Sequence, residues 1–188
     1  VALLSENAMD VALDIAGAAS TRPSLPPYER AEILRKVSAA VAQRSEEFAL
    51  LIAREGGKPL QDARVEVSRA VQTLALCAEE STRNAGREIP MGGTQKSFGR
   101  LAMTTREPIG VVVAFSAFNH PLNLLAHQIG PAVAAGCPVL IKPAPATPIC
   151  CMALVELFRE AGLPPDYLIP IPCTNEHAAV LATDPRMA

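Results

Sequence analysis

Apolar residues recur at helical spacing through the amino-terminal part of the chain. Downstream of Pro26-Pro27 the recurring positions are Ile33, Leu34, Val37, Val41, Phe48, Leu51 and Ile52. Apolar residues three and four positions apart share one face of a helix, so this pattern predicts helical structure as far as the Gly56-Gly57-Lys58-Pro59 loop. Residues 5–19 are predicted to form a weaker helix. Residues 61–84 are predicted to form a further helix that carries Val65, Ala70, Val71, Leu74 and Leu76.

The pattern changes at Pro108, where short apolar runs begin to alternate with helical segments. Residues 109–115, 138–142 and 168–172 are predicted strands, and residues 121–136, 148–162 and 176–183 are predicted helices. Such alternation is typical of βαβ units and of a parallel sheet. We therefore expect an α/β fold, with amino-terminal helices followed by a partial parallel, Rossmann-like sheet. Three strands are few for such a sheet, so we expect the chain to be part of a longer protein.

A carboxamide and a lysine stand where two of the predicted strands end. Asn119 follows the run that ends at Phe115, and Lys142 closes the next run. Ligands bind beyond the carboxyl ends of the strands in an open α/β sheet. Asn119 and Lys142 therefore belong to one site if the two runs are neighbouring parallel strands. Residues 98–106 differ from both runs and are predicted to form an extended strand with a polar face.

Composition and charge give no sign of a nucleic-acid-binding, membrane-spanning or metal-binding protein. A net charge of -2 gives no reason to expect a nucleic-acid or acidic-membrane partner. No apolar run reaches the ~18 residues that a membrane span needs. The five cysteines show no C-x-x-C spacing and do not cluster with the three histidines, so no metal site is expected. We interpret the cysteines as reduced, mostly buried thiols of a cytoplasmic protein.

Several fragments in a fixed order resemble the aldehyde dehydrogenase superfamily. They are Glu55-Gly56-Gly57-Lys58-Pro59, Arg106-Glu107-Pro108-Ile109-Gly110-Val111, Phe118-Asn119-His120-Pro121, the segment 129–136, Lys142-Pro143 and the segment 160–164. The resemblance covers nearly the whole chain. It implies a helical part of the nucleotide-binding domain over 1–97, a strand of an oligomerisation arm over 98–107, and a partial βαβ nucleotide-binding domain over 108–188.

The resemblance also implies an NAD or NADP site. Phe115, Ser116, Ala117 and Phe118 would lie against the nicotinamide half, and Lys142 with Pro143 would meet the adenosine ribose. The family usually continues with a glutamate that clasps the ribose hydroxyls and repels a 2′-phosphate, whereas this chain has Pro145. Lys142 would then be free to meet a 2′-phosphate as a point charge. We therefore expect NADP to be accepted as well as NAD.

Asn119 has two interpretations. In the first, which the resemblance implies, its amide N–H stabilises the oxyanion that forms when a thiolate attacks an aldehyde. Removal of one such donor typically costs on the order of 10²–10³ in turnover. In the second, Asn119 caps the helix that follows Pro121. The two roles can coexist.

The resemblance places the catalytic cysteine and its glutamate base beyond Ala188. None of the five cysteines stands in a matching motif, and all five are expected to be structural. The 188-residue chain is therefore expected to be inactive by itself.

Arg69 and His120 are candidate substrate residues. The resemblance places Arg69 on the helix face that lines the substrate funnel, and His120 follows Asn119 directly. Two cationic or polar groups there favour an anionic aldehyde. The alternative is that Arg69 is one more charge on a solvated helix face, together with Arg64 and Glu66. His127 and His177 are expected to be structural or solvated.

The resemblance therefore implies the amino-terminal, cofactor-binding part of an NAD(P)-dependent aldehyde dehydrogenase, an oxidoreductase that oxidises an aldehyde to a carboxylic acid. A homodimer or homotetramer is expected for the longer protein. Two alternatives within enzymes are an acylating, coenzyme-A-dependent member and a phosphate-linked aldehyde reductase of the same superfamily. A third alternative is a non-catalytic module that binds nucleotide or partner chains.

Overall fold

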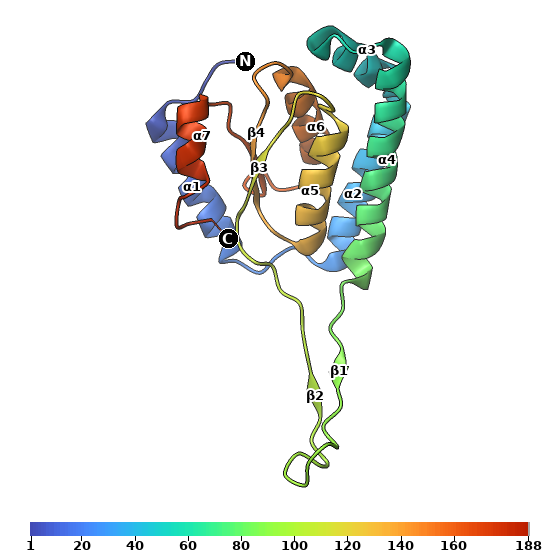
Figure 1. Ribbon diagram of the computed structural model, residues 1–188, viewed down its shortest axis with the longest axis vertical. Helices are drawn as coiled ribbons and strands as arrows, with labels where there is room; N and C mark the ends of the chain where they lie inside the picture. The colour runs from blue at the N-terminus through green and yellow to red at the C-terminus, as the bar shows by residue number, and fades with distance from the viewer. Residues whose placement is uncertain (188) are drawn as a thin grey trace.

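The computed structural model describes residues 1–187 as a layered α/β fold with a projecting hairpin (Figure 1). The elements are α1 (Glu6–Ser20), α2 (Pro27–Gln43), α3 (Ser45–Gly56), α4 (Leu60–Arg83), β1 (Glu88–Ile89), β2 (Ala102–Met103), β3 (Val112–Phe115), α5 (Asn123–Ala135), β4 (Val139–Lys142), α6 (Pro148–Glu160), β5 (Leu168–Pro170) and α7 (Asn175–Leu181). Helices α1 and α7 cover one face of the sheet, α5 and α6 cover the other, and α2 and α4 pack outside α5. The expected fold class is confirmed.

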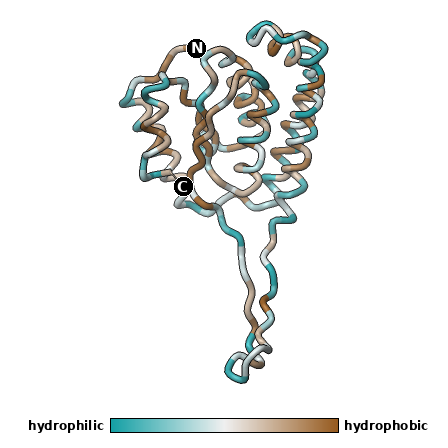
Figure 2. Tube along the Cα trace, viewed as in Figure 1, coloured by the Kyte–Doolittle hydropathy of each residue, from teal (hydrophilic) through white to brown (hydrophobic). Residues whose placement is uncertain are grey.

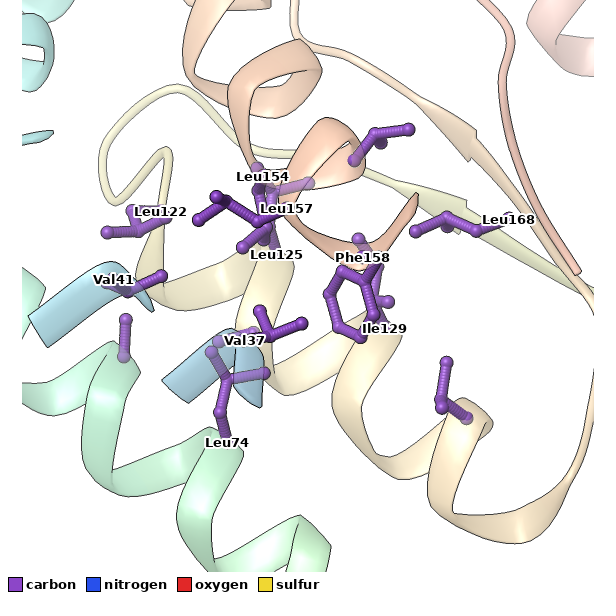
Figure 3. Close-up of a cluster of buried hydrophobic side chains, with 14 of the residues drawn as sticks. Val37, Val41, Leu74, Leu122, Leu125, Ile129, Leu154, Leu157, Phe158 and Leu168 are labelled. Atoms are coloured by element: carbon purple, nitrogen blue, oxygen red, sulfur yellow. The ribbon is translucent and has the colours of Figure 1, made fainter. Parts of the chain in front are cut away.

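The three-stranded sheet is parallel, in the order β3-β4-β5. Successive side chains of a strand point to opposite faces, so β4 contributes to two cores. Val139 and Ile141 belong to the larger core, whereas Leu140 belongs to a smaller core under α1 and α7. The sheet is the most continuously apolar part of the chain (Figure 2). The large core joins α2, α4, α5, α6 and β5 around Phe158 (Figure 3).

The amino-terminal helices differ from the sequence prediction in two details. The continuous helical pattern is divided at Arg44, which caps α2 and precedes α3. On α4, Val65 and Leu76 are exposed, and the buried stripe instead runs through Ala63, Glu66, Val67, Ala70, Leu74, Cys77, Ala78 and Ser81. Small residues predominate in this stripe, which also holds one carboxylate, and α4 packs against α2 and α5. At Gly130 of α5, an added Cβ would lie 2.9 Å from the Sγ atom of Cys77.

The projecting hairpin consists of β1 and β2, which pair antiparallel through Glu88 with Met103 and Ile89 with Ala102. The strand predicted over 98–106 is therefore confined to Ala102–Met103, and its partner β1 was not predicted. Phe98 is 79% exposed and Leu101 is 75% exposed. The hairpin projects away from the layered part of the fold (Figure 1), and its large apolar side chains are exposed.

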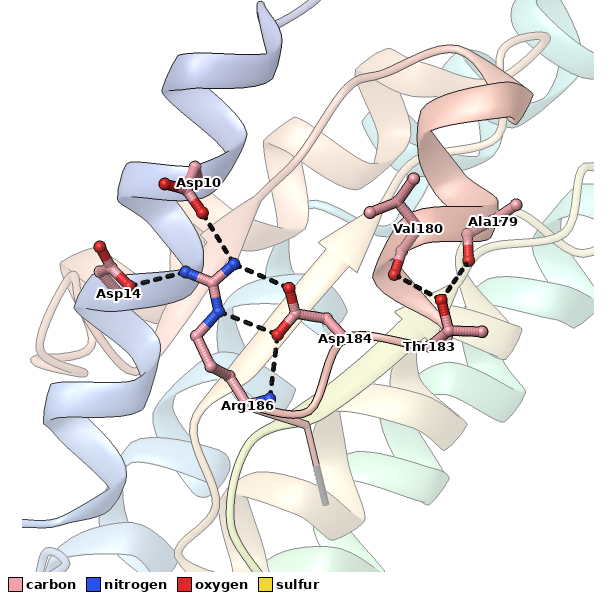
Figure 4. A network of polar contacts seen from close by, with 7 residues as sticks. All are labelled: Asp10, Asp14, Ala179, Val180, Thr183, Asp184 and Arg186. Carbon is pink, nitrogen blue, oxygen red and sulfur yellow. Dashed lines mark hydrogen bonds and ion pairs between the residues drawn. The ribbon is translucent and has the colours of Figure 1, made fainter.

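An ion-pair network joins the end of the described chain to α1 (Figure 4). The Arg186 guanidinium donates to Asp10 at 2.7 Å, to Asp14 at 2.6 Å and to Asp184 at 2.7 Å. The hydrogen bond that Arg186 donates to Asp184 lowers the pKa of this carboxyl to about 2. The network fixes α1 beside α7, so the first helix of the chain closes the second core. None of the described helices is long and apolar enough to cross a membrane.

Candidate active site

The carboxyl ends of β3 and β4 lie side by side, as the sequence predicted. Phe115 is the register partner of Lys142, and the Ser116 amide donates to the Lys142 carbonyl at 2.9 Å. Both strands end on the side of the sheet away from the hairpin (Figure 1). The turn after β3 carries Asn119, so a carboxamide and a lysine ammonium stand at one edge of the sheet.

The Asn119 side chain is exposed and makes no hydrogen bond within the described part of the chain. It does not cap α5, which begins at Asn123 with Leu122 at the cap position. The first amides of this helix are held by Glu66 of α4, whose Oε1 accepts from Leu122 N at 2.8 Å and from Asn123 N at 3.1 Å. A distant carboxylate performs the capping function, and the Asn119 amide is left available to a ligand.

Glu66 is buried, although its spacing from Arg64 and Arg69 suggested a solvated helix face. It is 2% exposed, and its Oε2 accepts from the Lys58 ammonium at 2.6 Å. Removal of one partner from a buried ion pair leaves an unpaired charge and is strongly destabilising. The pair therefore fastens the loop after α3 to α4. At the same loop, a Cβ on Gly56 would lie 3.9 Å from the Phe118 carbonyl.

Arg69 and His120 share a pocket of about 240 Å³. Its lining is Lys58, Asp62, Val65, Glu66, Arg69 and His120. The structure thus brings together the two residues that the sequence proposed for the substrate. It adds one lysine and two carboxylates that the proposal did not include. Arg69 and Asp62 are both exposed and form no ion pair among residues 1–187.

Lys142 lies at the buried end of β4 and does not extend freely into solvent. It is 6% exposed, and its Nζ donates to Asn175 Oδ1 at 3.3 Å. One of its three N–H donors is therefore held by the first residue of α7, and two donors remain. Asn175 was not predicted as a site residue.

The segments beyond the two strand ends present the other predicted cofactor residues. Phe115 and Phe118 are exposed, whereas Ser116 and Ala117 are partly buried. Beyond β4, Pro143 and Pro145 line a pocket of about 140 Å³ with Val1, Leu3, Ala144, Pro148, Pro172 and Cys173. Pro145 is exposed and brings no charge to this pocket. The segment after β3 therefore exposes aromatic surface, and β4 ends in a buried ammonium.

The cysteines are not placed as nucleophiles. All five are free thiols in buried positions. Burial raises the pKa of Cys77 and Cys173, and it raises that of Cys151 to about 12. An attacking cysteine needs a lowered pKa, since the thiolate is the nucleophile. Residues 1–187 also contain no group of three metal-binding side chains.

Helix α6 repeats the capping arrangement of α5. Glu55 at the end of α3 accepts from Ile149 N at 2.7 Å and from Cys150 N at 2.8 Å. Sequence reasoning missed Glu55, Lys58 and Glu66. One signal was available for Glu66, because it stands three residues from Ala63 and four from Ala70, on the stripe that the small residues mark. A carboxylate on such a stripe indicates a buried partner.

A match to a known protein family extends over the whole chain. A family model described as "Aldehyde dehydrogenase family" matches residues 1–188. The 3-sulfolactaldehyde dehydrogenase of Priestia megaterium is 48% identical over 138 residues, which are 73% of this chain and 29% of that protein. The chain thus spans less than a third of this relative's length.

Solved structures agree with these sequence matches. Aldehyde dehydrogenase 21 from Physcomitrella patens, in complex with the reaction product succinate, superposes with a TM-score of 0.93 at 37% identity, over 98% of this chain and 39% of that chain. A glyceraldehyde-3-phosphate dehydrogenase from Methanocaldococcus jannaschii, complexed with NADP, superposes with a TM-score of 0.92 at 30% identity, over 100% of this chain and 41% of that chain.

Proposed function

The chain belongs to the aldehyde dehydrogenase family, and we propose that it is the cofactor-binding part of an enzyme that oxidises an aldehyde to a carboxylic acid with NAD or NADP. The observation that carries this proposal is the pairing of Phe115 with Lys142, which puts the Asn119 amide and the Lys142 ammonium at one sheet edge. This edge is where α/β sheets bind their ligands.

Asn119 is proposed to act on the reacting oxygen. Attack of a thiolate on an aldehyde places a negative charge on that oxygen, and an uncharged amide N–H stabilises it without attracting the thiolate. The exposed Asn119 side chain, which no described residue engages, suits this role. Because the described cysteines are buried, we assign the attacking thiol to none of them.

Phe115, Ser116, Ala117 and Phe118 are proposed to lie against the nicotinamide half of the cofactor, which supplies the hydride acceptor when bound. Lys142 and Pro143 are proposed to hold the ribose of the adenosine half. Pro145 places no carboxylate near that ribose, so a 2′-phosphate meets Lys142 without repulsion from this position. We propose that NADP is accepted together with NAD. The NADP complex of the Methanocaldococcus jannaschii structure is consistent with this proposal.

The substrate is proposed to be a short aldehyde with an anionic tail. Arg69 offers a permanently charged, planar donor group suited to carboxylate, sulfonate or phosphate oxygens. Arg69 shares its pocket with His120, the residue next to Asn119. Two similar proteins agree with this class, since sulfolactaldehyde carries a sulfonate, and the product succinate carries a second carboxylate besides the one that aldehyde oxidation forms.

Assembly and compartment are also proposals. The exposed Phe98, Leu101 and Met103 of the hairpin suit a second subunit, because large apolar patches commonly mark protein interfaces. We propose a homodimer or homotetramer for the native protein that contains this chain. We place it in the cytoplasm, where free thiols such as the five described here persist.

The direct test is aldehyde-dependent formation of NADH or NADPH by the native protein that contains this chain, with the purified 188-residue chain as the control. We expect turnover by the first and none by the second. Turnover by the 188-residue chain that thiol blocking abolishes would show that a cysteine was misassigned. Dinucleotide binding without turnover of any aldehyde by the native protein would favour a binding module.

A further inference from the structure

Glu66 connects two parts of the pocket through its two carboxylate oxygens. Oε1 accepts from the backbone amides of Leu122 and Asn123 at 2.8 Å and 3.1 Å. Oε2 accepts from Lys58 Nζ at 2.6 Å. The carboxylate is almost fully buried, and the Lys58 side chain is 17% exposed. The position of the Lys58 ammonium is therefore set by a short, largely dehydrated ion pair.

The same ammonium lies 3.0 Å from Nδ1 of His120. A lysine ammonium has three hydrogens to donate and no lone pair, so in this contact Nδ1 must accept. A neutral imidazole that accepts at Nδ1 carries its hydrogen on Nε2. Glu66 Oε2 is 3.4 Å from the same Nδ1 and would require the opposite tautomer. The shorter contact, which is with Lys58, decides between the two.

We infer that Lys58 is a positioning residue, which fixes His120 as the Nε2–H tautomer and so provides a neutral hydrogen-bond donor beside Arg69. This inference rests on the proposed function as far as the substrate is concerned. The pocket charges that face His120 come from Lys58, Glu66, Asp62 and Arg69. Lys58 and Glu66 neutralise each other, and Asp62 opposes the charge of Arg69, so the pocket carries no net excess of positive charge. An anionic tail would therefore depend on a direct contact with Arg69, and His120 would supply direction.

The tautomer can be read by nitrogen NMR of histidine side chains in the native protein that contains this chain. The chain has three histidines, and the signal that is lost in His120→Gln identifies the His120 ring. At about pH 8, above the ~6.5 typical of histidine, we expect His120 to carry its hydrogen on Nε2. A wild-type ring with its hydrogen on Nδ1 would overturn the inference.

Two variants separate positioning from packing. In Lys58→Met the ammonium is lost, and Nδ1 is expected to become a donor to Glu66 Oε2. In Lys58→Arg a cationic donor is retained, so the Nε2–H form should persist. His127 and His177, which lie outside the pocket, serve as internal controls for the fold and should not change. An unchanged His120 tautomer in Lys58→Met would contradict the role of Lys58. If Lys58→Met does not fold, the wild-type and Lys58→Arg spectra still decide the tautomer.

Kinetics of the native protein that contains this chain test the consequence for the substrate. Loss of one oriented hydrogen bond should raise the KM of an anionic aldehyde about threefold to tenfold in Lys58→Met and leave kcat nearly unchanged. The KM for propanal should not move. Equal changes for both aldehydes would exclude a specificity role. The NMR result does not depend on catalysis, so it stands or fails separately from the proposed function.

Discussion

The chain leaves β3 and β4 through two turns that are built alike, since each leads to a helix whose first amides are held by a carboxylate from the amino-terminal helices. Glu66 holds α5 and Glu55 holds α6. The functional groups differ. The turn after β3 carries Asn119, exposed and without a hydrogen-bond partner in the described residues, whereas β4 ends in Lys142, buried and bonded to Asn175.

This difference suggests a division of function along the sheet edge. A free amide can turn toward a charge that develops during a reaction, so Asn119 suits the transition state. A buried, fixed ammonium suits a group that stays bound throughout, so Lys142 suits the cofactor. In both turns, a glutamate from another helix caps the helix that follows. The polar side chains of the turn are therefore not needed as caps.

The largest effect is expected from Asn119→Ala in the native protein that contains this chain. Loss of an oxyanion donor should lower kcat by about 10²–10³. The measurement is the steady-state rate of NADH or NADPH formation at saturating substrate. Because Glu66 caps α5, thermal stability should stay close to wild type. Normal kcat with lowered stability would instead give Asn119 a structural role.

The two capping carboxylates should differ in their contribution to stability. Glu66→Gln leaves the Lys58 charge unpaired in a mostly buried position, so the free energy of unfolding should fall by about 3 kcal/mol, the lower end for a buried pair because Lys58 keeps some exposure. Glu55→Gln keeps an acceptor for the α6 amides and leaves no buried cation behind, so its cost should be below ~1 kcal/mol. Urea unfolding of the native protein that contains this chain measures both. Equal losses of unfolding free energy would mean that the two capping carboxylates contribute equally to stability.

Arg69 and Asp62 allow the pocket to be tested with opposite charges. Arg69→Met should raise the KM of an anionic aldehyde at least ~10-fold, which corresponds to about 1.4 kcal/mol of lost binding. Propanal should be barely affected. Asp62→Asn is the matched control, because removal of a negative charge should lower the KM of the same anionic aldehyde. An unchanged KM in both variants would mean that Arg69 is a solvated surface charge and does not bind the substrate.

A smaller effect is expected from Pro145→Glu. A carboxylate at this position can accept from the ribose hydroxyls and repel a 2′-phosphate. The ratio of kcat/KM for NAD to that for NADP should rise roughly threefold to tenfold, the range of a typical hydrogen bond. A wild-type enzyme that uses NAD alone would contradict the proposed effect of Pro145.

The sequence predicted the sheet edge better than the pocket. The adjacency of Phe115 and Lys142 follows from two apolar runs joined by one helix, a local pattern with few topological alternatives. The burial of Glu66 depends on the docking of α5 and on Lys58 from another segment, so its place on α4 alone gave an incomplete signal. Likewise β1 is two residues long and has no alternating pattern to reveal it. The bond from Asn175 to Lys142 depends on where α7 lies, which periodicity does not specify.

The division of function is tested most directly by a comparison of Lys142→Met with Asn119→Ala in the native protein that contains this chain. Dinucleotide Kd and kcat at saturating cofactor are measured for both variants. The account predicts that Lys142→Met weakens NADP binding about tenfold or more, as expected for a lost charge-assisted contact, and largely preserves kcat. Asn119→Ala should do the reverse, with an unchanged Kd and a greatly lowered kcat. If both variants changed only Kd, or both changed only kcat, the proposed division of function would be contradicted.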